Sequence, residues 1–348
     1  MIAAGGTGGH VFPGLAVADV LRGSGWRVVW LGSQSGMEAG LVAKRGYDMS
    51  AVKFSGVRGK GPIALALLPL KLLLAFWQSA RAILAERPDV VLGMGGYMSF
   101  PGGMMAVLLG RPLVIHEQNS VPGLANRVLA AVADRILCAF PGALRRATHV
   151  GNPVRPEIAA IPEPKARYAG RSGTLRLLVV GGSLGAKALN EIVPAALALL
   201  PAAARPVVTH QSGAQHLEAL KSAYAAAGVA ASAAAFIDDM AAAYAGADLV
   251  ICRAGATTIA ELAAAGAPGI LVPFPHAVDD HQTTNARFLS DAGAAILVPQ
   301  TELTPERLAS LVSGLDRGRL LEMASRARSL GRPGAAAAVA RACMEIAP

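Results

Sequence analysis

Four polar side chains in the last third of the sequence have the types and the spacing to hold a hydroxyl-rich ligand. Thr257 and Glu261 are four residues apart on one predicted helix, and Gln282 and Asn285 are three apart on the next, so each pair shares a helix face. A carboxylate suits the paired hydroxyls of a ribose, and an amide suits sugar hydroxyls because it offers both a donor and an acceptor. Taken singly, each pair is better explained as a solvated charge or a cap. Together they favour a ligand site.

The predicted elements around these residues bring both pairs to one edge of a parallel sheet. Residues 247–252 indicate a buried strand, 253–256 a tight turn and 257–265 a helix that ends at Gly266. A second strand follows at residues 269–273, and Asp279 or Asp280 is placed to cap a helix that runs through Asn285. Open α/β folds bind ligands where such turns lie side by side, at the carboxyl ends of the strands.

Two glycine-rich turns are the second chemical signal. They are GGTGGH at residues 5–10 and GGSLGA at residues 181–186. Glycines after a strand let backbone N–H groups approach a phosphate, and the following helix favours its charge. Neither turn fits Gly-x-Gly-x-x-Gly, and no acidic residue ends the strand before Ser33, so a dinucleotide is not predicted. One such turn is equally explained as a tight reversal, whereas two, each opening its own half, favour ligand loops.

The sequence contains no Asp-x-Asp, the usual carboxylate pair of a metal–diphosphate complex. If a nucleotide diphosphate leaves here, its charge must be met by a helix terminus and by basic residues such as Arg155 and Arg253. The prediction is metal-independent chemistry without a cofactor.

Strands and helices alternate along both halves, which predicts an α/β fold with two doubly wound parallel sheets. In the first half we expect strands at residues 26–31, 47–54, 89–94, 113–117 and 135–140, helices at 10–22, 37–45, 101–109 and 123–131, and an apolar segment at 63–84. Prolines within residues 151–173 indicate an interdomain linker. Alternation restarts at 175–180, two or three helices follow residue 304, and the last begins near Pro333. We expect domains at 1–155 and 156–332 and a final helix at 333–348 that returns to the first domain.

Composition narrows the class of protein. The 348 residues, 53% hydrophobic and 16% charged, suffice for two cores, and no signal peptide is predicted. Cys138, Cys252 and Cys343 are too widely spaced for a zinc site or a disulfide framework and suit a reducing cytosol. The net charge of +9 suits a phosphorylated ligand, an anionic membrane or nucleic acid. Nucleic acid is disfavoured, because aromatics are only 5% and there is neither a stacking platform nor a basic recognition helix.

Residues 61–84 form an apolar segment with a basic rim. Pro69 and Lys71 interrupt a run already shorter than the ~20 apolar residues that a bilayer requires, so a spanning helix is not predicted. Leu73, Phe76 and Trp77 are expected apolar anchors, surrounded by Lys53, Arg58, Lys60, Lys71 and Arg81. Such a surface suits peripheral attachment to an anionic membrane. The alternative is an ordinary core helix with solvated flanks.

Six motifs, in order, resemble the MurG family of bacterial transferases. They are GGTGGH at residues 5–10, HEQN at 116–119, GNPVR at 151–155, GGSLGA at 181–186, RAGA at 253–256 continuing to Glu261, and DHQTTN at 280–285. This family adds N-acetylglucosamine from its UDP sugar to lipid-linked muramyl-pentapeptide in peptidoglycan synthesis. The resemblance spans almost the whole chain. One departure is that only residues 1–4 precede the first turn, fewer than family members carry, which shortens the first strand.

The resemblance implies a GT-B glycosyltransferase with two Rossmann-like domains facing a cleft. The C-terminal domain would hold UDP-N-acetylglucosamine, and the N-terminal domain the undecaprenyl-diphosphate-linked muramyl-pentapeptide, at the cytoplasmic face of the inner membrane. By motif, the donor-binding residues are Thr7, Gly8, Gly9, Asn119, Arg155, Ser183, Ile237, Arg253, Ala256, Thr257, Thr258, Ile259, Ala260, Glu261, Gln282 and Asn285. Gly5, Gly6 and His116 would lie on the acceptor side.

Individual roles follow from the same resemblance. Ser183 and Arg155 would face the diphosphate and Glu261 the ribose. The backbone near Ile237 would read the uracil. The sugar would be met by Gln282, Asn119 and Asn285.

The implied reaction inverts an α-linked donor into a β-linked product in one displacement. The C4 hydroxyl of the acceptor attacks while UDP leaves from the opposite face. A base must take the hydroxyl proton, and imidazole is well matched near neutral pH. His10, at the first turn, is the predicted base, with His116 and Glu117 as alternatives. His10 is equally explained as a helix-start residue that binds backbone or phosphate.

Two other functions are compatible with the sequence. One is a UDP-N-acetylglucosamine 2-epimerase of the same fold, which needs no apolar surface. The other is a non-catalytic sugar-nucleotide sensor or membrane-recruited scaffold that keeps the donor pocket and lacks the base.

Overall fold

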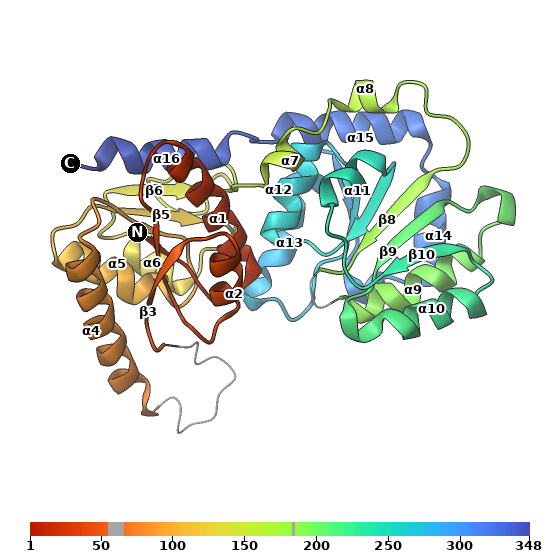
Figure 1. The fold of residues 1–348 in the computed structure, drawn as a ribbon. Coiled ribbons are helices and arrows are strands. Elements are labelled where there is room, and N and C mark those ends of the chain that lie inside the picture. The colour runs from red at the N-terminus through yellow and green to blue at the C-terminus, as the bar shows by residue number, and fades with distance from the viewer. Residues whose placement is uncertain (55–65, 183–184) are drawn as a thin grey trace. The chain divides into compact units, whose positions relative to one another are not determined.

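The computed structural model describes residues 1–54, 66–182 and 185–348, and the chain divides into two compact α/β units (Figure 1). The first unit comprises Met1–Arg155 together with Pro333–Pro348, and the second comprises Pro156–Arg332. Each unit is built on its own parallel sheet. Parallel neighbours require long crossovers, which here are mostly helices.

The sheet of the first unit has the strand order β3-β2-β1-β4-β5-β6-β7. Its strands are β1 (Ile2–Ala3), β2 (Val29–Gly32), β3 (Asp48–Ala51), β4 (Val91–Gly93), β5 (Leu113–Glu117), β6 (Arg135–Cys138) and β7 (Thr148–His149). The last of these has no counterpart among the predicted strands. The order reverses between β1 and β4, so the turns that follow these two strands leave the sheet next to each other.

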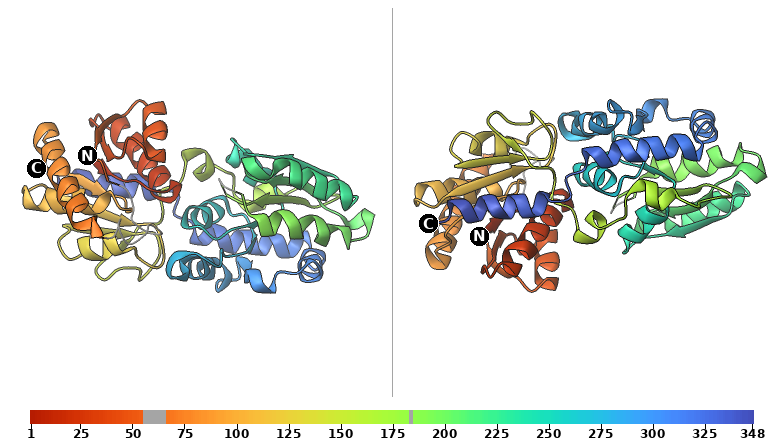
Figure 2. Two further views of the ribbon diagram at one scale, coloured as in Figure 1. Left: turned by 90° about the horizontal axis from the view of Figure 1, so that it is seen from below. Right: turned by 90° about the horizontal axis from the view of Figure 1, so that it is seen from above.

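Helices cover both faces of this sheet. α1 (Gly8–Gly23), α2 (Met37–Lys44) and α16 (Ala335–Ile346) share one core, in which Trp30, Val339 and Cys343 are fully buried. α4 (Leu68–Glu86), α5 (Ser99–Leu108) and α6 (Leu124–Leu129) pack on the other face, around Ile83 and Leu129. α16 packs against α1, although the two are far apart in the sequence (Figure 2). α16 is thus part of the first unit.

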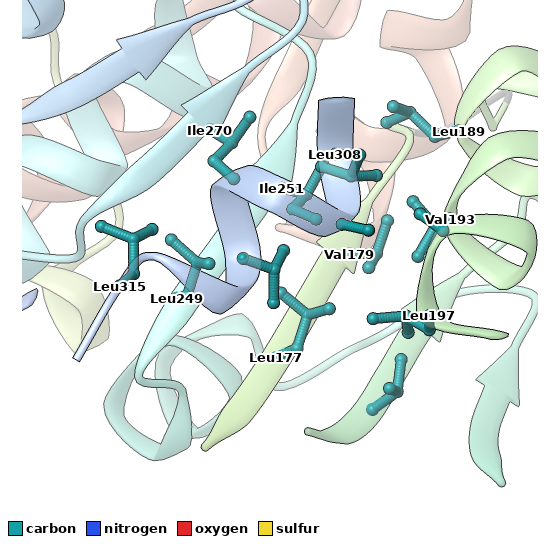
Figure 3. Close-up of a cluster of buried hydrophobic side chains, with 14 of the residues drawn as sticks. Leu177, Val179, Leu189, Val193, Leu197, Leu249, Ile251, Ile270, Leu308 and Leu315 are labelled. Atoms are coloured by element: carbon teal, nitrogen blue, oxygen red, sulfur yellow. The ribbon is translucent and has the colours of Figure 1, made fainter. Parts of the chain in front are cut away.

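The sheet of the second unit has the order β10-β9-β8-β11-β12-β13 and reverses between β8 and β11. Its strands are β8 (Arg176–Val180), β9 (Val207–Gln211), β10 (Ala231–Ala234), β11 (Leu249–Cys252), β12 (Gly269–Leu271) and β13 (Ala295–Leu297). Its helices are α7 (Pro156–Ala159), α8 (Pro164–Tyr168), α9 (Lys187–Ala198), α10 (Leu217–Ala226), α11 (Met240–Gly246), α12 (Ala256–Ala265), α13 (His281–Ser290), α14 (Pro305–Ser313) and α15 (Arg317–Leu330). Figure 3 shows the core, where Val179 and Ile251 of the sheet meet Val193 of α9 and Leu308 of α14.

The linker expected at residues 151–173 is wrong over most of its length. α7 and α8 fall inside it and pack on the second unit. The Arg167 guanidinium donates to the carbonyl of Gly266 (2.6 Å), and the Tyr168 hydroxyl donates to the carbonyl of Asp248 (2.7 Å). Pro164 lies in the first turn of α8, where a missing N–H leaves no bond unmade. Pro156 and Pro164, which suggested an interdomain linker, therefore begin helices instead.

The break expected at Pro69 is also wrong. α4 begins at Leu68, and Pro69 lies in its first turn, so the proline starts the helix rather than interrupting it. Residues 61–65 of the expected segment lie outside the described residues. Among the described helices, α4 alone is long and apolar enough to cross a membrane by length and composition, with 17% of its apolar window buried. A buried stripe that includes Ala75 and Ile83 packs it onto the first unit.

A buried carboxylate joins three segments of the second unit. Asp248, just before β11, is fully buried and binds the guanidinium groups of Arg171 (2.6 Å) and Arg317 (3.2 Å) and the backbone N–H of Arg176 (2.9 Å). Burial by itself raises the pKa of Asp248, but the Arg176 N–H and the two guanidinium groups hold that pKa below its usual value. The carboxylate thus ties α15 to the start of β8.

We expect Asp248→Asn to lower the free energy of unfolding by about 2 kcal/mol at neutral pH, because two guanidinium groups lose their counter-charge. The destabilisation should have its full size above the pKa of an unfolded aspartate, about 4. It should become smaller as the pH falls through the pKa of Asp248 in the folded state, which is lower. Urea unfolding at several pH values measures it. Asp291→Asn, at an exposed aspartate after α13, is the control. Equal losses in the two variants would contradict the role of the network.

Candidate functional site

The two strand-to-helix turns expected at one sheet edge lie side by side in the second unit. β11 and β12 are paired neighbours, with Cys252 opposite Leu271, so the turns that follow them leave the same edge. α12 begins at Ala256 and ends at Ala265, and Gly266 caps it in a left-handed conformation (φ 58°). Ala256 and Ile259 face the interior, whereas Thr258 and Ala260 are half-buried. The predicted helix and its stop are confirmed.

Glu261 is a buried carboxylate rather than a solvated helix charge. The residue is 8% exposed, and its Oε2 accepts a hydrogen bond from the Tyr244 hydroxyl of α11 (3.1 Å). One turn earlier, the hydroxyl oxygen of Thr257 is enclosed and has no hydrogen-bond partner among the described residues. Burial of polar groups costs free energy that hydrogen-bond partners recover. This face of α12 is therefore suited to a ligand that brings hydroxyl groups.

The two amides of α13 brace the neighbouring turns. Gln282 Oε1 accepts the backbone N–H groups of Ala254 (3.2 Å) and Phe274 (2.9 Å), so one side chain joins both turns. Asn285 is fully buried, and its Nδ2 donates to the carbonyl of Ala254 (3.3 Å). Asn285 has no exposed surface, so in this structure it positions the turn rather than meeting a ligand.

Arg253 and Asp280 lie at the same sheet edge, and each has hydrogen-bond partners within the protein. The Arg253 guanidinium donates to two carbonyls of the turn after β12 and to Gln300 Oε1 (2.6 Å), and burial lowers its pKa. Asp280 precedes α13 in a left-handed conformation (φ 49°), and its Oδ1 accepts from the Thr283 hydroxyl (2.7 Å) rather than from a backbone N–H. The helix begins close to where it was expected, but the predicted cap is wrong in its chemistry.

The second glycine turn is closed against the end of β9. Gly182 and Gly185 have left-handed φ values (85° and 78°), and a Cβ at Gly185 would lie 1.9 Å from the carbonyl oxygen of Ser212. α9 begins directly after the turn, so its N-terminal N–H groups face the same edge as α12. Ser183, predicted to face a diphosphate, lies outside the described residues. Ile237 is half-buried between β10 and α11.

In the first unit, the first glycine turn is organised around a buried carboxylate. Glu38 of α2 is fully buried and accepts the backbone N–H groups of Ser33 (3.1 Å) and Gly6 (3.5 Å). The N–H of Gly6 is therefore directed at an anion of the protein itself instead of the expected phosphate. Thr7 is the residue before α1, and Gly8 and Gly9 form its first turn, all with exposed surface.

Two of the three candidate bases are enclosed. His116 is fully buried, with its Nε2 2.9 Å from the carbonyl oxygen of Gly151, and burial lowers the pKa of His116 to about 4 in spite of that hydrogen bond. Glu117 is 2% exposed. Its carboxylate accepts the backbone N–H of Asn119 (2.9 Å) and the amide of Asn126 (2.9 Å). Both groups hold the loop after β5 in place.

His10, in the first turn of α1, lies against the turn that follows β4. Its Nδ1 is 2.8 Å from Gln118 Oε1, and a Cβ added at Gly95 would lie 2.9 Å from that same Nδ1. His10 is half-buried, so of the three candidates it keeps the most exposed surface. Asn119 and Arg155 also belong to the first unit and are half-buried.

Three residues that hold these edges were not predicted: Gln118, Glu38 and Tyr244. Gln118 lies within the HEQN motif beside His116, and a polar residue at the end of a buried strand was the available signal. Glu38 and Tyr244 lie far along the chain from some or all of their partners, so no local pattern marks them.

α4 presents an apolar face to solvent. Leu70, Leu73 and Trp77 are 67%, 65% and 58% exposed, and the Arg81 guanidinium lies over the Trp77 ring (5.8 Å). Phe76, expected as an anchor beside Leu73 and Trp77, is half-buried and meets the ring of Phe100 edge-on (5.6 Å). That expectation is corrected: the helical period turns Phe76 inward and leaves Leu70, Leu73, Leu74 and Trp77 outside.

Both units match one family. The Glycosyltransferase family 28 N-terminal domain matches residues 1–138, and the Glycosyltransferase family 28 C-terminal domain matches residues 176–339. The UDP-N-acetylglucosamine–N-acetylmuramyl-(pentapeptide) pyrophosphoryl-undecaprenol N-acetylglucosamine transferase of Ralstonia nicotianae is 63% identical, over 100% of this chain and 96% of the relative. The protein of the same name from Nitrosospira multiformis is 62% identical, over 99% and 98%.

Solved structures agree with these relatives. The crystal structure of Acinetobacter baumannii MurG has a TM-score of 0.87 at 42% identity and covers 99% of each chain. The putative UDP-N-acetylglucosamine 2-epimerase from Listeria monocytogenes has a TM-score of 0.64 at 13% identity and covers 97% of this chain and 93% of its own. At that identity the second likeness concerns the fold alone.

Proposed function

Because the chain belongs to the family of UDP-N-acetylglucosamine–N-acetylmuramyl-(pentapeptide) pyrophosphoryl-undecaprenol N-acetylglucosamine transferases, we propose that it transfers N-acetylglucosamine from UDP-N-acetylglucosamine to the C4 hydroxyl of lipid-linked N-acetylmuramyl-pentapeptide. The product is the lipid-linked disaccharide of peptidoglycan synthesis. The observation that favours catalysis over mere binding is an accessible imidazole, His10, held by a hydrogen bond at the sheet edge of the first unit.

The second unit binds the donor. Glu261, oriented by Tyr244, accepts hydrogen bonds from the ribose hydroxyls. The N-terminus of α9 at the second glycine turn faces the diphosphate, and the backbone near Ile237 reads the uracil. The turn that Gln282 and Asn285 brace meets the sugar. These assignments are supported by burial and by the shared sheet edge, where ligands of such folds bind.

The first unit supplies the base. His10 Nε2 takes the proton of the C4 hydroxyl as the oxygen forms its bond to the anomeric carbon. The bond from that carbon to the diphosphate oxygen breaks, and its electron pair leaves with UDP. A displacement of this kind inverts the configuration. Imidazole is suited to the step because its ordinary pKa of about 6.5 leaves it neutral at cellular pH.

The transfer needs no metal ion. The sequence has no Asp-x-Asp pair, and among the described residues no three His, Cys, Asp or Glu side chains are grouped to hold an ion. The helix terminus and basic side chains stabilise the leaving diphosphate instead.

Product analysis tests the function directly. The protein should convert UDP-N-acetylglucosamine and lipid-linked muramyl-pentapeptide into UDP and the lipid-linked disaccharide, and the rate should survive EDTA. An epimerase would instead form UDP-N-acetylmannosamine without acceptor, and a scaffold would leave both substrates intact. A loss in EDTA that added metal restores would overturn metal independence while leaving the transfer itself standing.

Glu261→Ala should weaken binding of UDP-N-acetylglucosamine roughly ten-fold or more, because charge-assisted hydrogen bonds worth ~1.5–3 kcal/mol are lost. Isothermal titration calorimetry measures the change. Tyr244→Phe is the matched control, since it removes the 3.1 Å hydrogen bond and keeps the carboxylate. Its effect should be several-fold smaller. Unchanged affinity in a folded Glu261→Ala protein would remove Glu261 from the site.

The exposed face of α4 attaches the protein to the cytoplasmic side of an anionic inner membrane. Leu70, Leu73 and Trp77 supply apolar contact area. Beside them, a pocket of about 770 Å³ is lined by Lys53, Lys71 and Arg81 among others. Cations next to exposed apolar side chains suit phospholipid headgroups. Arg58 and Lys60, the other members of the predicted rim, lie outside the described residues.

Replacing Leu73 and Trp77 with Gln should release the protein from anionic vesicles without lowering its melting temperature, since both side chains are more than half exposed. Vesicle sedimentation and thermal unfolding measure the two effects. The control replaces Leu199 and Val207, which are 55% and 62% exposed in the second unit, with Gln. Retained sedimentation of the α4 variant, or equal release of the control, would count against this surface.

A further inference from the structure

We infer that Gln118 is a positioning residue that fixes His10 in the tautomer whose Nε2 is free to accept a proton. The inference rests on the proposed function and deepens it, because it concerns how the base is prepared before the acceptor arrives. It follows from a chain of side-chain contacts at the end of β5, in which each donor determines the next acceptor.

The chain begins at a backbone carbonyl. The oxygen of Gly151 can only accept, so His116 Nε2, which lies 2.9 Å away, must carry the hydrogen. A neutral imidazole has one N–H, and His116 stays neutral above its pKa of about 4, which burial has lowered. His116 Nδ1 is therefore an acceptor. The group that faces it must be a donor.

Gln118 then determines which ring nitrogen of His10 carries the hydrogen. Its Nε2 lies 2.9 Å from His116 Nδ1 and 3.0 Å from the His116 carbonyl oxygen, so both amide hydrogens are donated. The amide orientation is thereby settled, and Oε1 points to His10 Nδ1 at 2.8 Å. An amide oxygen accepts only, so His10 Nδ1 carries the hydrogen. In the neutral ring the lone pair then belongs to Nε2.

The surroundings of His10 enforce this arrangement. Gly95 has a left-handed φ of 84°, and a Cβ there would lie 2.9 Å from His10 Nδ1 and 3.2 Å from Gln118 Oε1. The Nδ1 edge of the ring is thus closed against the turn after β4. Within the described part of the chain, His10 Nε2 has no hydrogen-bond partner.

The ionisable groups near His10 have other partners. Those on the neighbouring elements are His116 and Glu117 of β5, Tyr97 of the turn after β4, and Glu38 of α2. Glu117 is bound to its own loop, and Tyr97 interacts with Glu38. Gln118 Oε1 accepts a hydrogen bond from His10 Nδ1 in both protonation states of the ring, because the imidazolium also donates from Nδ1. Proton uptake therefore needs no rearrangement of the side chains.

Nuclear magnetic resonance tests the tautomer without any turnover. Long-range ¹H–¹⁵N correlation spectra of the seven histidines distinguish Nδ1–H from Nε2–H rings, and His10→Asn identifies the signal of His10. Wild-type protein near pH 7.5 should show His10 as Nδ1–H and His116 as Nε2–H. Gln118→Leu should release His10 into a mixture. A wild-type His10 found as Nε2–H would overturn the inference even if no Gln118 variant folds.

Kinetics supply the second readout. Gln118→Leu should lower kcat roughly 10²-fold with little change in the KM of the donor, as expected when a base loses its productive tautomer. Gln118→Glu keeps an acceptor opposite His10 but adds charge. The acidic limb of its rate profile should therefore move about one pH unit or more upward. Asn126→Ala removes a buried amide of α6 that binds the end of β5 without contacting His10, and it should leave that limb in place.

These outcomes separate the relay from the function itself. If wild-type protein forms no lipid-linked disaccharide, the proposed transfer fails, whatever the tautomer of His10. If wild type is active while Gln118→Leu retains full turnover and Gln118→Glu keeps the wild-type limb, the relay fails and the transfer stands. A shift of the limb in Asn126→Ala equal to that in Gln118→Glu would reduce Gln118 to a structural role.

Discussion

Both sheets are parallel, and this constraint determines where the strand-to-helix turns of the described residues lie. Each strand must be followed by a return across the sheet, so all loops at one edge come from strand ends and all loops at the other from helix ends. The order reverses between β1 and β4 and again between β8 and β11. At each reversal, the connections that follow the two central strands run to opposite sides of the sheet, which leaves room for a ligand between them. His10 stands at the first reversal, and the second glycine turn faces the Arg253 turn at the other.

The two units differ in how a buried carboxylate is bound at the edge of the sheet. The second unit buries a carboxylate, Glu261, whose Oε2 accepts a hydrogen bond from the Tyr244 hydroxyl. In the first unit, Glu38 lies against the glycine turn and accepts the backbone N–H of Gly6 together with that of Ser33. The proposed function assigns nucleotide binding to the second unit and proton transfer to the first.

Much of the fold could be predicted from the sequence, because periodicity and chain-breaking residues act locally. β5 occupies the predicted residues, and Gly266 ends α12 because glycine adopts a left-handed conformation at little cost. Proline was ambiguous: the same missing N–H suits a linker or a first helical turn, and only packing decides, as at Pro69 and Pro164. For the site, residue types indicated Glu261 and His10. Their partners Tyr244 and Gln118 could not be assigned, because hydrogen-bond partners are chosen by the tertiary fold.

The packing of α16 on α1 makes the second unit an insertion within the first. The core around α1 includes Val339, Ala340 and Cys343, which the ribosome adds after the whole of the second unit. During synthesis the first unit must therefore wait with one flank of its sheet uncovered, while the second unit can already close. The first core is then completed only by a segment that is synthesised after the second unit.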